Sequence, residues 1–546
     1  MDKQIFERNV LALSKTDPRL CARLSAAVTT EGIYRFINSR TGDLIPALTE
    51  RGGAARPLHS IVDPRREGAR LVGTLTEEGY IVFLGLGGAF APEAALKRAE
   101  TQKVLVIEYG CNGVAELFGS RDYLELLQDP RFRLLLDPSG DEVETCLLNT
   151  YTPAADGGIR VFPLYTRTGP EERFNRAGEA IKRAIDAVSR DYSVQAFFGK
   201  RWFSNIIRNL SLAEAPAPAI PPIRQAAVCA AGPSLDAQFP RIKKDRDNTF
   251  LIACDTSLPA LLSAGIEPDG VISIDCQQIS YRHFFKTIPP GTKLFLDLSS
   301  PPTVAAGTEN RFFFSGGHPL GLFICREWRP FPVLDSSGAN VTYAALSLAL
   351  LLGAETVTFY GADFSYPGGK TYARGTYIYP YFENLQSRYR PLEALHSAFL
   401  YRDSSLQKHE GQNHKGAENW YYDTRALRFY RETIHRRAAS SGVRVENLAG
   451  LSRRGAPRGS RKLSLLAPGP ARRSAADFLV SLRESIGELS GFDGLSQGTE
   501  GERELLTTLL PLAAAIRRSS ADISRGELFK AVKAFSLQEL SRIIHS

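Results

Sequence analysis

The sequence predicts an α/β protein with two parallel-sheet domains and a helical C-terminal region. Residues 226–275 contain three short apolar runs that alternate with helical patterns, which is typical of a parallel sheet with crossover helices. Residues 80–108 repeat this pattern around a glycine-rich turn. Beyond residue 475, apolar side chains such as Leu482, Ile486 and Leu489 recur at helical spacing. We therefore expect a Rossmann-like central domain, a second Rossmann-like domain before it, and helices after it.

The length and composition are those of an ordinary globular protein. A chain of 546 residues is long enough for about two to four domains. Hydrophobic residues make up 43% of the chain and charged residues 23%. The sequence has no apolar run of membrane-spanning length, and its first residues lack the layout of a signal peptide. We therefore expect a cytoplasmic protein without a transmembrane segment.

The net charge of +8 comes from one stretch near the C-terminus. Between Glu446 and Asp477 there are seven basic residues and no acidic residue, so the rest of the chain is close to neutral. This distribution predicts a solvated basic linker at residues 451–474 and argues against nucleic acid as a partner. The seven basic residues are Arg453, Arg454, Arg458, Arg461, Lys462, Arg472 and Arg473.

The N-terminal domain is predicted to span residues 1–214, with a leading helix. A strand ending at Leu84 is followed by a glycine-rich turn at residues 85–88, and the next strand ends in Glu108. An acid after the second strand is typical of dinucleotide and methyl-donor sites, but G-x-G-G is not the full G-x-G-x-x-G motif. We expect a Rossmann-like scaffold that binds no cofactor, with a methyl-donor enzyme as an alternative.

The central domain, residues 223–450, follows a proline-rich boundary and carries small polar residues after its predicted strands. Ligands of open α/β sheets bind outside the carboxyl ends of the strands, so we expect these residues to converge on one crevice. A turn between strand and helix can hold a phosphate, although Ser234 could simply cap its helix. The residues are Gly232, Pro233, Ser234, Asp255, Thr256, Ser257, Asp275, Ser336, Ser337, Gly338, Asn340, Gly361 and Asp363.

Several motifs together resemble the bacterial motility accessory factor (Maf) family of flagellin glycosyltransferases, whose central domain is shared with 6-hydroxymethylpterin diphosphokinase MptE-like proteins. The resemblance covers roughly residues 1–450. One departure is G-A-D at residues 361–363, where the family more often has G-Q-D. The motifs are G-P-S-L at 232–235, D-T-S at 255–257, A-G-I-x-P-D at 264–269, S-I-D at 273–275, S-S-G-A-N at 336–340, G-A-D-F at 361–364, G-G-K-T-Y at 368–372, L-H-S-x-x-D-P-x-x-E at 58–67 and F-G-K-R-W at 198–202.

The resemblance implies an enzyme whose central domain is akin to small bacterial sialyltransferases. Such an enzyme would transfer a nonulosonic acid of the pseudaminic or legionaminic type from its CMP-activated form to Ser or Thr of flagellin. The CMP sugar would be a co-substrate, and neither a cofactor nor a metal would be required. The sequence likewise shows no His, Cys and Asp spacing that predicts a metal site.

The transfer requires a phosphate cradle, contacts to the nucleotide and a base for the acceptor hydroxyl. We expect Gly232 and Ser234 to cradle the phosphate and the acids of the next two strand ends to face the ribose and base. The 336–340 segment would bind the sugar carboxylate. Asp363 is the leading general base, and His318 and His283 are alternatives. The residues expected to close over the donor are Lys370, Tyr372 and Arg374.

Two other functions remain open from the sequence. The MptE-like resemblance also fits pyrophosphoryl transfer from ATP, which would depend on a divalent metal. A non-catalytic factor that binds flagellin on a retired transferase scaffold is the other alternative, and it would not turn over a CMP donor.

Overall fold

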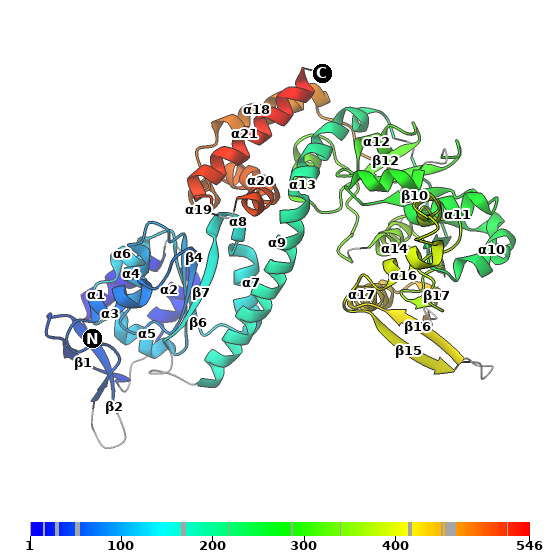
Figure 1. Cartoon of the computed structure of the whole chain (residues 1–546). Helices are drawn as coiled ribbons and strands as arrows, with labels where there is room; N and C mark the ends of the chain where they lie inside the picture. The colour runs from blue at the N-terminus through cyan, green and yellow to red at the C-terminus, as the bar shows by residue number, and fades with distance from the viewer. Residues whose placement is uncertain are drawn as a thin grey trace. The chain divides into compact units, whose positions relative to one another are not determined.

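The computed structural model separates into two compact units (Figure 1). The first unit comprises residues 1–199 and 489–532, and the second comprises residues 200–488 and 533–546. The structure describes residues 2–14, 17–27, 32–49, 55–164, 171–217, 219–284, 288–338, 340–412, 418–448, 451–453, 466–520 and 522–545.

The first unit contains a four-stranded parallel sheet in the order β6-β5-β4-β7. The first strand in sequence lies between the second and the fourth, which is the Rossmann arrangement. The strands are nearly continuous apolar runs because both faces are covered, by α1, α2, α4 and α5 on one side and by α7 and α9 on the other. The strands are β4 (Glu78–Leu84), β5 (Lys103–Glu108), β6 (Phe132–Leu136) and β7 (Gly158–Pro163).

The helices of the first unit are mostly short, and a small antiparallel sheet precedes the parallel one. That sheet is held by Glu116, whose carboxylate accepts the N–H groups of Ile33 and Tyr34. Its strands are β1 (Tyr34–Asn38), β2 (Leu44–Thr49) and β3 (Ala55–Pro57). The helices are α1 (Lys3–Ser14), α2 (Pro18–Ser25), α3 (Pro64–Val72), α4 (Phe90–Leu96), α5 (Cys111–Phe118), α6 (Leu124–Gln128), α7 (Gly140–Thr150), α8 (Pro153–Asp156), α19 (Gly494–Gln497) and α20 (Glu500–Ser519).

The second unit contains an eight-stranded sheet in the order β12-β11-β10-β9-β8-β13-β17-β18. Its strands are parallel except β18, which runs antiparallel to β17. The predicted strands of this region are confirmed, and β18 is an additional strand at the start of the predicted basic linker. The strands are β8 (Gln225–Cys229), β9 (Phe250–Cys254), β10 (Gly270–Ser273), β11 (Lys293–Asp297), β12 (Arg311–Phe314), β13 (Thr356–Tyr360), β17 (Arg444–Leu448) and β18 (Leu451–Arg453).

Helix α14 is the most deeply buried helix of this unit's main core. Its side chains pack with those of β8, β9 and β13, which explains why it is apolar on all faces. The helices associated with this sheet are α10 (Leu235–Lys244), α11 (Leu258–Ser263), α12 (Pro302–Ala305), α13 (Pro319–Glu327), α14 (Val341–Leu351), α17 (Arg425–Ser441) and α18 (Ala475–Glu488), with 3-10 segments at Arg246–Asn248, Asp255–Ser257 and Gln278–Phe284.

Residues 364–412 and 418–423 form a small subdomain between β13 and α17. The sequence shows no clear periodicity at residues 376–420. The subdomain combines two aromatic-rich helices with a three-stranded antiparallel sheet of order β14-β16-β15. Its elements are β14 (Tyr366–Pro367), α15 (Ile378–Glu383), α16 (Leu392–Leu400), β15 (Gln407–Gln412) and β16 (Glu418–Asp423).

Two long helices cross the boundary between the units in sequence. Helix α9 (Glu171–Glu214) begins in the first unit and ends in the second, and α21 (Arg525–Ile544) also has residues in both. The predicted helices beyond residue 475 are confirmed, but they are divided between the two units. Half of the predicted basic linker, residues 454–465, lies outside the described residues. Over the described ranges, no helix has both the length and the apolarity needed to cross a bilayer.

Candidate functional site

The sheet of the second unit reverses its winding between β8 and β13. Successive strands from β8 to β12 are added on one side, and β13 then returns to the other side of β8. In open α/β sheets this switch point is where ligands bind. The segments that follow the two strands are the predicted motifs beginning at Gly232 and Gly361. The N–H of Gly232 donates to the Gly361 carbonyl at 2.9 Å.

Asp363 joins these two segments. Its Oδ2 accepts the N–H of Ser234 at 2.9 Å, so this carboxylate caps α10, and the Ser234 side chain makes no cap hydrogen bond. Burial raises the pKa of Asp363, while the hydrogen bonds from Ser234 act in the opposite direction. A Cβ at Gly232 would lie 2.3 Å from that Oδ2 and 2.5 Å from the Gly361 carbonyl oxygen. Glycine at this position therefore lets the two strand ends approach each other.

Gly361 is required for a different reason. Its backbone has a φ of +64°, and a Cβ there would lie 2.4 Å from the carbonyl oxygen of Ala230. The N–H of Gly361 donates to the Gln238 side chain on α10 at 2.8 Å. The turn after β13 is thus fixed against the turn after β8.

The ends of β9 and β10 carry two acidic side chains. Asp255 is buried, and its Oδ2 accepts the Ser273 hydroxyl at 2.7 Å while its Oδ1 accepts the Thr256 N–H at 2.6 Å and hydroxyl at 3.0 Å. Asp275 accepts the Gln277 N–H at 2.9 Å through Oδ1. Burial, aided by the negative charge of Asp255, raises the pKa of Asp275. Both oxygens of Asp255 are engaged, so Asp275 is the more available carboxylate.

Ser257, also predicted to contact the nucleotide, has a structural set of contacts. Its hydroxyl donates to the carbonyls of Cys229 at 2.7 Å and Cys254 at 2.8 Å. It therefore ties the end of β8 to the end of β9.

The end of β11 carries a buried carboxylate, Asp297, which is not among the predicted site residues. Its Oδ1 accepts the Ser299 N–H at 2.8 Å and hydroxyl at 2.6 Å, and its Oδ2 accepts the Gly316 N–H at 2.6 Å. Burial raises its pKa. The Ser336 hydroxyl donates to the Gly316 carbonyl at 3.0 Å, which brings the 336–340 segment to this edge of the sheet. The polar residues after Asp297 were the available signal.

Residues 335–338 and Asn340 precede α14. Asn340 caps this helix by accepting the Tyr343 N–H at 2.9 Å. Asp335 accepts the Ser337 N–H at 3.1 Å and hydroxyl at 2.6 Å. Gly338 is packed against Tyr343, whose ring atoms a Cβ would meet at 2.2 Å. Ala339 of the S-S-G-A-N motif lies outside the described residues.

The segment after Asp363 lies over the end of β8. The Ala373 N–H donates to the Ala231 carbonyl at 2.9 Å, and the Arg374 N–H donates to Asp236 at 3.0 Å. Burial raises the pKa of Tyr372. The hydrogen bond to Asp236 places the Arg374 backbone at the first turn of α10. Lys370 and Arg374 are both exposed, and a contact of either side chain with the donor stays a prediction.

The two histidines named as alternative bases have different surroundings. His318 caps α13, where its Nδ1 accepts the Leu320 N–H at 3.2 Å, and burial lowers its pKa to about 3. His283 packs edge-on against Tyr377 with ring centroids 4.7 Å apart. Its Nδ1 is buried without a hydrogen-bond partner among the described residues. These contacts favour a helix-capping role for His318.

The glycine-rich turn of the first unit is occupied by side chains of the protein itself. Glu108 accepts the Leu86 N–H at 2.6 Å through Oε2 and the Tyr109 N–H at 2.8 Å through Oε1. The Gly88 N–H donates to Nε2 of His59 at 2.7 Å, and Nδ1 of His59 lies 3.3 Å from Glu67. The donors and the carboxylate that a dinucleotide would contact are hydrogen-bonded to other groups of the protein in this structure.

The chain is similar to known proteins in its central region and in its fold. Residues 200–369 match the family model described as 6-hydroxymethylpterin diphosphokinase MptE-like. The solved Maf glycosyltransferase of Magnetospirillum magneticum AMB-1 is 14% identical, with a TM-score of 0.57 over 100% of this chain and 96% of its own. At this identity the likeness concerns the fold. The predicted resemblance is confirmed to this extent: residues 200–369 match the MptE-like model, and the chain is similar in fold to a Maf glycosyltransferase.

Curated relatives are similar over shorter stretches. Three uncharacterized proteins of Treponema pallidum (strain Nichols) are 38%, 40% and 34% identical over 117, 95 and 185 residues. These stretches cover 21%, 17% and 33% of this chain. They cover 56%, 34% and 30% of the relatives, so the chain spans about half of their length or less.

Proposed function

We propose that this protein is a glycosyltransferase that moves a nonulosonic acid from a CMP-activated donor to a Ser or Thr hydroxyl of flagellin. The observation that supports this best is the pairing of the Gly232 and Gly361 turns at the switch point of the second sheet, with Asp363 between them. The nonulosonic acid and the flagellin acceptor follow from the Maf resemblance.

Asp363 has the surroundings of a general base in this proposal. Its Oδ2 is fixed by the Ser234 N–H, so Oδ1 would receive the proton. The acceptor oxygen forms a bond to the anomeric carbon, and the bond from that carbon to the phosphate oxygen breaks, with the electron pair leaving on CMP. The acceptor proton passes to Asp363. A carboxylate with a raised pKa is better suited to this transfer near neutral pH than an ordinary one.

The other strand ends would hold the donor. Asp275 has the carboxylate that is open to ribose hydroxyls, and Asp255 positions the surrounding turn through Ser273 and Thr256. The Ser336 and Ser337 hydroxyls offer polar contacts to the sugar. Because the Ser234 N–H is already taken by Asp363, the phosphate would be bound by groups beyond that N–H.

Pyrophosphoryl transfer from ATP is the second candidate, because the family model that matches residues 200–369 is that of MptE-like diphosphokinases. In that case Asp255 and Asp275, which follow adjacent strands, would hold a divalent metal with the phosphates. Metal dependence separates the two reactions.

The test is incubation of the purified protein with CMP-pseudaminic acid and flagellin in the presence of EDTA. We expect release of CMP and a matching increase in flagellin mass, with loss of both in Asp363→Asn. The control is Glu355→Gln, which changes an exposed residue just before β13. This residue lies at the amino end of the strand, whereas the site lies at the carboxyl ends. Transfer from ATP only with Mg²⁺ would favour the diphosphokinase, and no turnover of either donor would favour a binding factor.

A further inference from the structure

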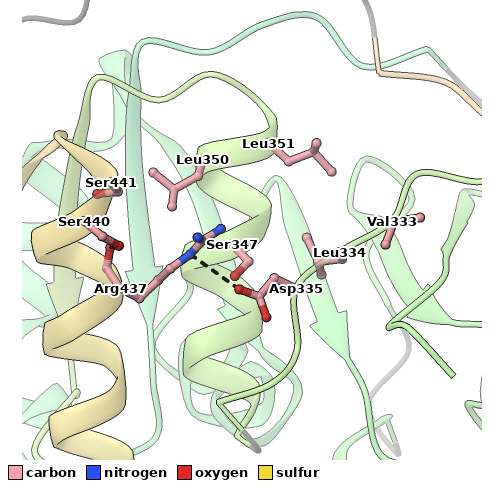
Figure 2. Close-up of a pocket in the computed structure, with 9 residues that line it drawn as sticks. All are labelled: Val333, Leu334, Asp335, Ser347, Leu350, Leu351, Arg437, Ser440 and Ser441. Carbon is pink, nitrogen blue, oxygen red and sulfur yellow. Dashed lines mark hydrogen bonds and ion pairs between the residues drawn. The ribbon is translucent and has the colours of Figure 1, made fainter. Parts of the chain in front are cut away.

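A cavity of about 310 Å³ lies among α14, α17 and the 333–335 segment of the second unit (Figure 2). It is lined by residues near the C-terminal ends of both helices, including Ser347 and Leu350 of α14 and Arg437 of α17. These helices end just before β13 and β17 begin, so this part of the cavity lies toward the amino ends of the strands. This part of the cavity lies away from the strand-end site described above, and the cavity meets the 335–340 segment only at Asp335.

Two polar groups in this cavity have no hydrogen-bond partner in the part of the chain that the structure describes. Ser347 is 3% exposed, and its hydroxyl has no partner among the described residues. The same holds for Nε of Arg437. Figure 2 shows Arg437 reaching from α17 toward Asp335, with Ser347 beside the pair; Nε of Arg437 is 3.7 Å from Oδ2 of Asp335. That separation is an ion pair but too long for a hydrogen bond. Buried polar groups are normally paired, so these groups indicate a missing partner.

The charges of the cavity indicate what that partner is. Arg437 and Asp335 balance each other, so the cavity has no net charge to attract an ion. Its unpaired groups are a donor on Arg437 and a hydroxyl on Ser347, beside acceptor oxygens on Asp335. A ligand hydroxyl can accept from Arg437 and donate to Asp335 at once. Leu334, Leu350 and Leu351 add apolar surface for the carbon face of such a molecule.

We propose that this cavity binds a small neutral ligand with several hydroxyl groups, of the size and chemistry of a monosaccharide. Arg437 and Ser347 supply the donors, and Asp335 supplies the acceptor. The volume is at the small end of the range for ligand pockets, which suits one sugar ring.

A ligand bound in this cavity would affect the 336–340 segment through Asp335. Besides its ion pair with Arg437, that carboxylate accepts the Ser337 hydroxyl at 2.6 Å and the Tyr343 hydroxyl at 2.8 Å. A ligand that hydrogen-bonds to Asp335 therefore adds a partner to the group that holds the start of α14. This coupling does not depend on the reaction that the strand-end site performs.

The experiment is saturation-transfer difference NMR, followed by calorimetric titration, with D-glucose, D-galactose and N-acetyl-D-glucosamine as probes. Ser347→Ala removes the unpaired hydroxyl, and Arg437→Lys keeps the charge beside Asp335 but removes the Nε donor. Arg436→Lys is the matched control, because Arg436 is the exposed neighbour of Arg437 on α17.

We expect at least one sugar to bind the wild type and Arg436→Lys equally, and to bind each cavity variant about tenfold more weakly. Hydrogen–deuterium exchange across residues 335–343 should slow when that sugar is added to the wild type. The Tm of Ser347→Ala should be no lower than that of the wild type, which shows that the variant folds. Failure of all three sugars to bind, equal binding by all variants, or preferential binding of inorganic phosphate or acetate would each overturn the proposal.

Discussion

Replacing Gly232 by alanine tests the packing at the switch point. The new Cβ would lie 2.3 Å from Oδ2 of Asp363 and 2.5 Å from the carbonyl oxygen of Gly361, both of which are fixed by hydrogen bonds. Overpacking of this kind costs about 1–3 kcal/mol. The lower entropy of the unfolded alanine chain offsets about 0.4–1 kcal/mol of that. We therefore expect the free energy of unfolding to fall by about 1–2 kcal/mol, mainly through displacement of Asp363.

The assay combines thermal unfolding with titration of CMP. Gly291→Ala is the control, because its Cβ would meet no atom within 4 Å and its backbone φ is not positive. We expect Gly232→Ala to lower the Tm by a few degrees and to weaken CMP binding, and Gly291→Ala to do neither. If Gly232→Ala has the stability and CMP affinity of the wild type, the close approach of the two turns contributes to neither stability nor CMP binding.

Three further substitutions test other features. His318→Asn retains a capping side chain but cannot titrate. Because burial lowers the folded pKa of His318 to about 3, the stability of the wild type should fall as the pH drops below about 6.5. Urea unfolding at each pH should show a smaller loss of stability for the variant. Asp297→Asn removes a carboxylate whose folded pKa is raised, so the variant should lose less stability than the wild type as pH rises above about 3.9. Loss of a hydrogen-bond acceptor should lower the stability of the variant by about 1–3 kcal/mol at pH 4. An unchanged pH profile would contradict the burial argument. Gly199→Ala places a Cβ 1.8 Å from the Pro511 carbonyl oxygen, so thermal unfolding should show a loss of about 1–3 kcal/mol or more, and a stable variant would refute the tight packing of α9 on α20.

Much of the fold follows from local patterns in the sequence. The strands of the second sheet are short apolar runs, and each is separated from the next by a helical or turn segment, so their positions could be predicted. The polar residues after these strands could be identified for the same reason. Their location at one edge of the sheet then follows from parallel topology.

The contacts that define the site could not be predicted in the same way. The carboxylate that caps α10 is Asp363, which lies 129 residues beyond Ser234 in the chain, so the local sequence suggested self-capping by Ser234. Asp297 and Gly316 belong to different strand ends, and nothing local indicates that they form a hydrogen bond. His59 fills the turn at Gly88 across 29 residues. Such pairings depend on how distant segments pack, and a single sequence does not encode them as a pattern.

The small subdomain after β13 was missed for a different reason. Its helices α15 and α16 are short and aromatic-rich, and its strands pair as a narrow antiparallel sheet. Tertiary packing among Ile378, Phe382 and Leu395 stabilises these elements, and their helical periodicity is too brief to detect.

The most direct test of the proposed function is calorimetric titration of CMP in EDTA, with ATP and Mg²⁺ as the comparison. The proteins are the wild type, Asp275→Asn and the control Glu355→Gln. A hydrogen bond to a charged group contributes about 1.5–3 kcal/mol, so Asp275→Asn should weaken CMP binding by about tenfold or more. The proposal predicts CMP binding without metal by the wild type and Glu355→Gln. Binding of ATP with Mg²⁺ but not of CMP, or CMP binding that Asp275→Asn leaves unchanged, would contradict it.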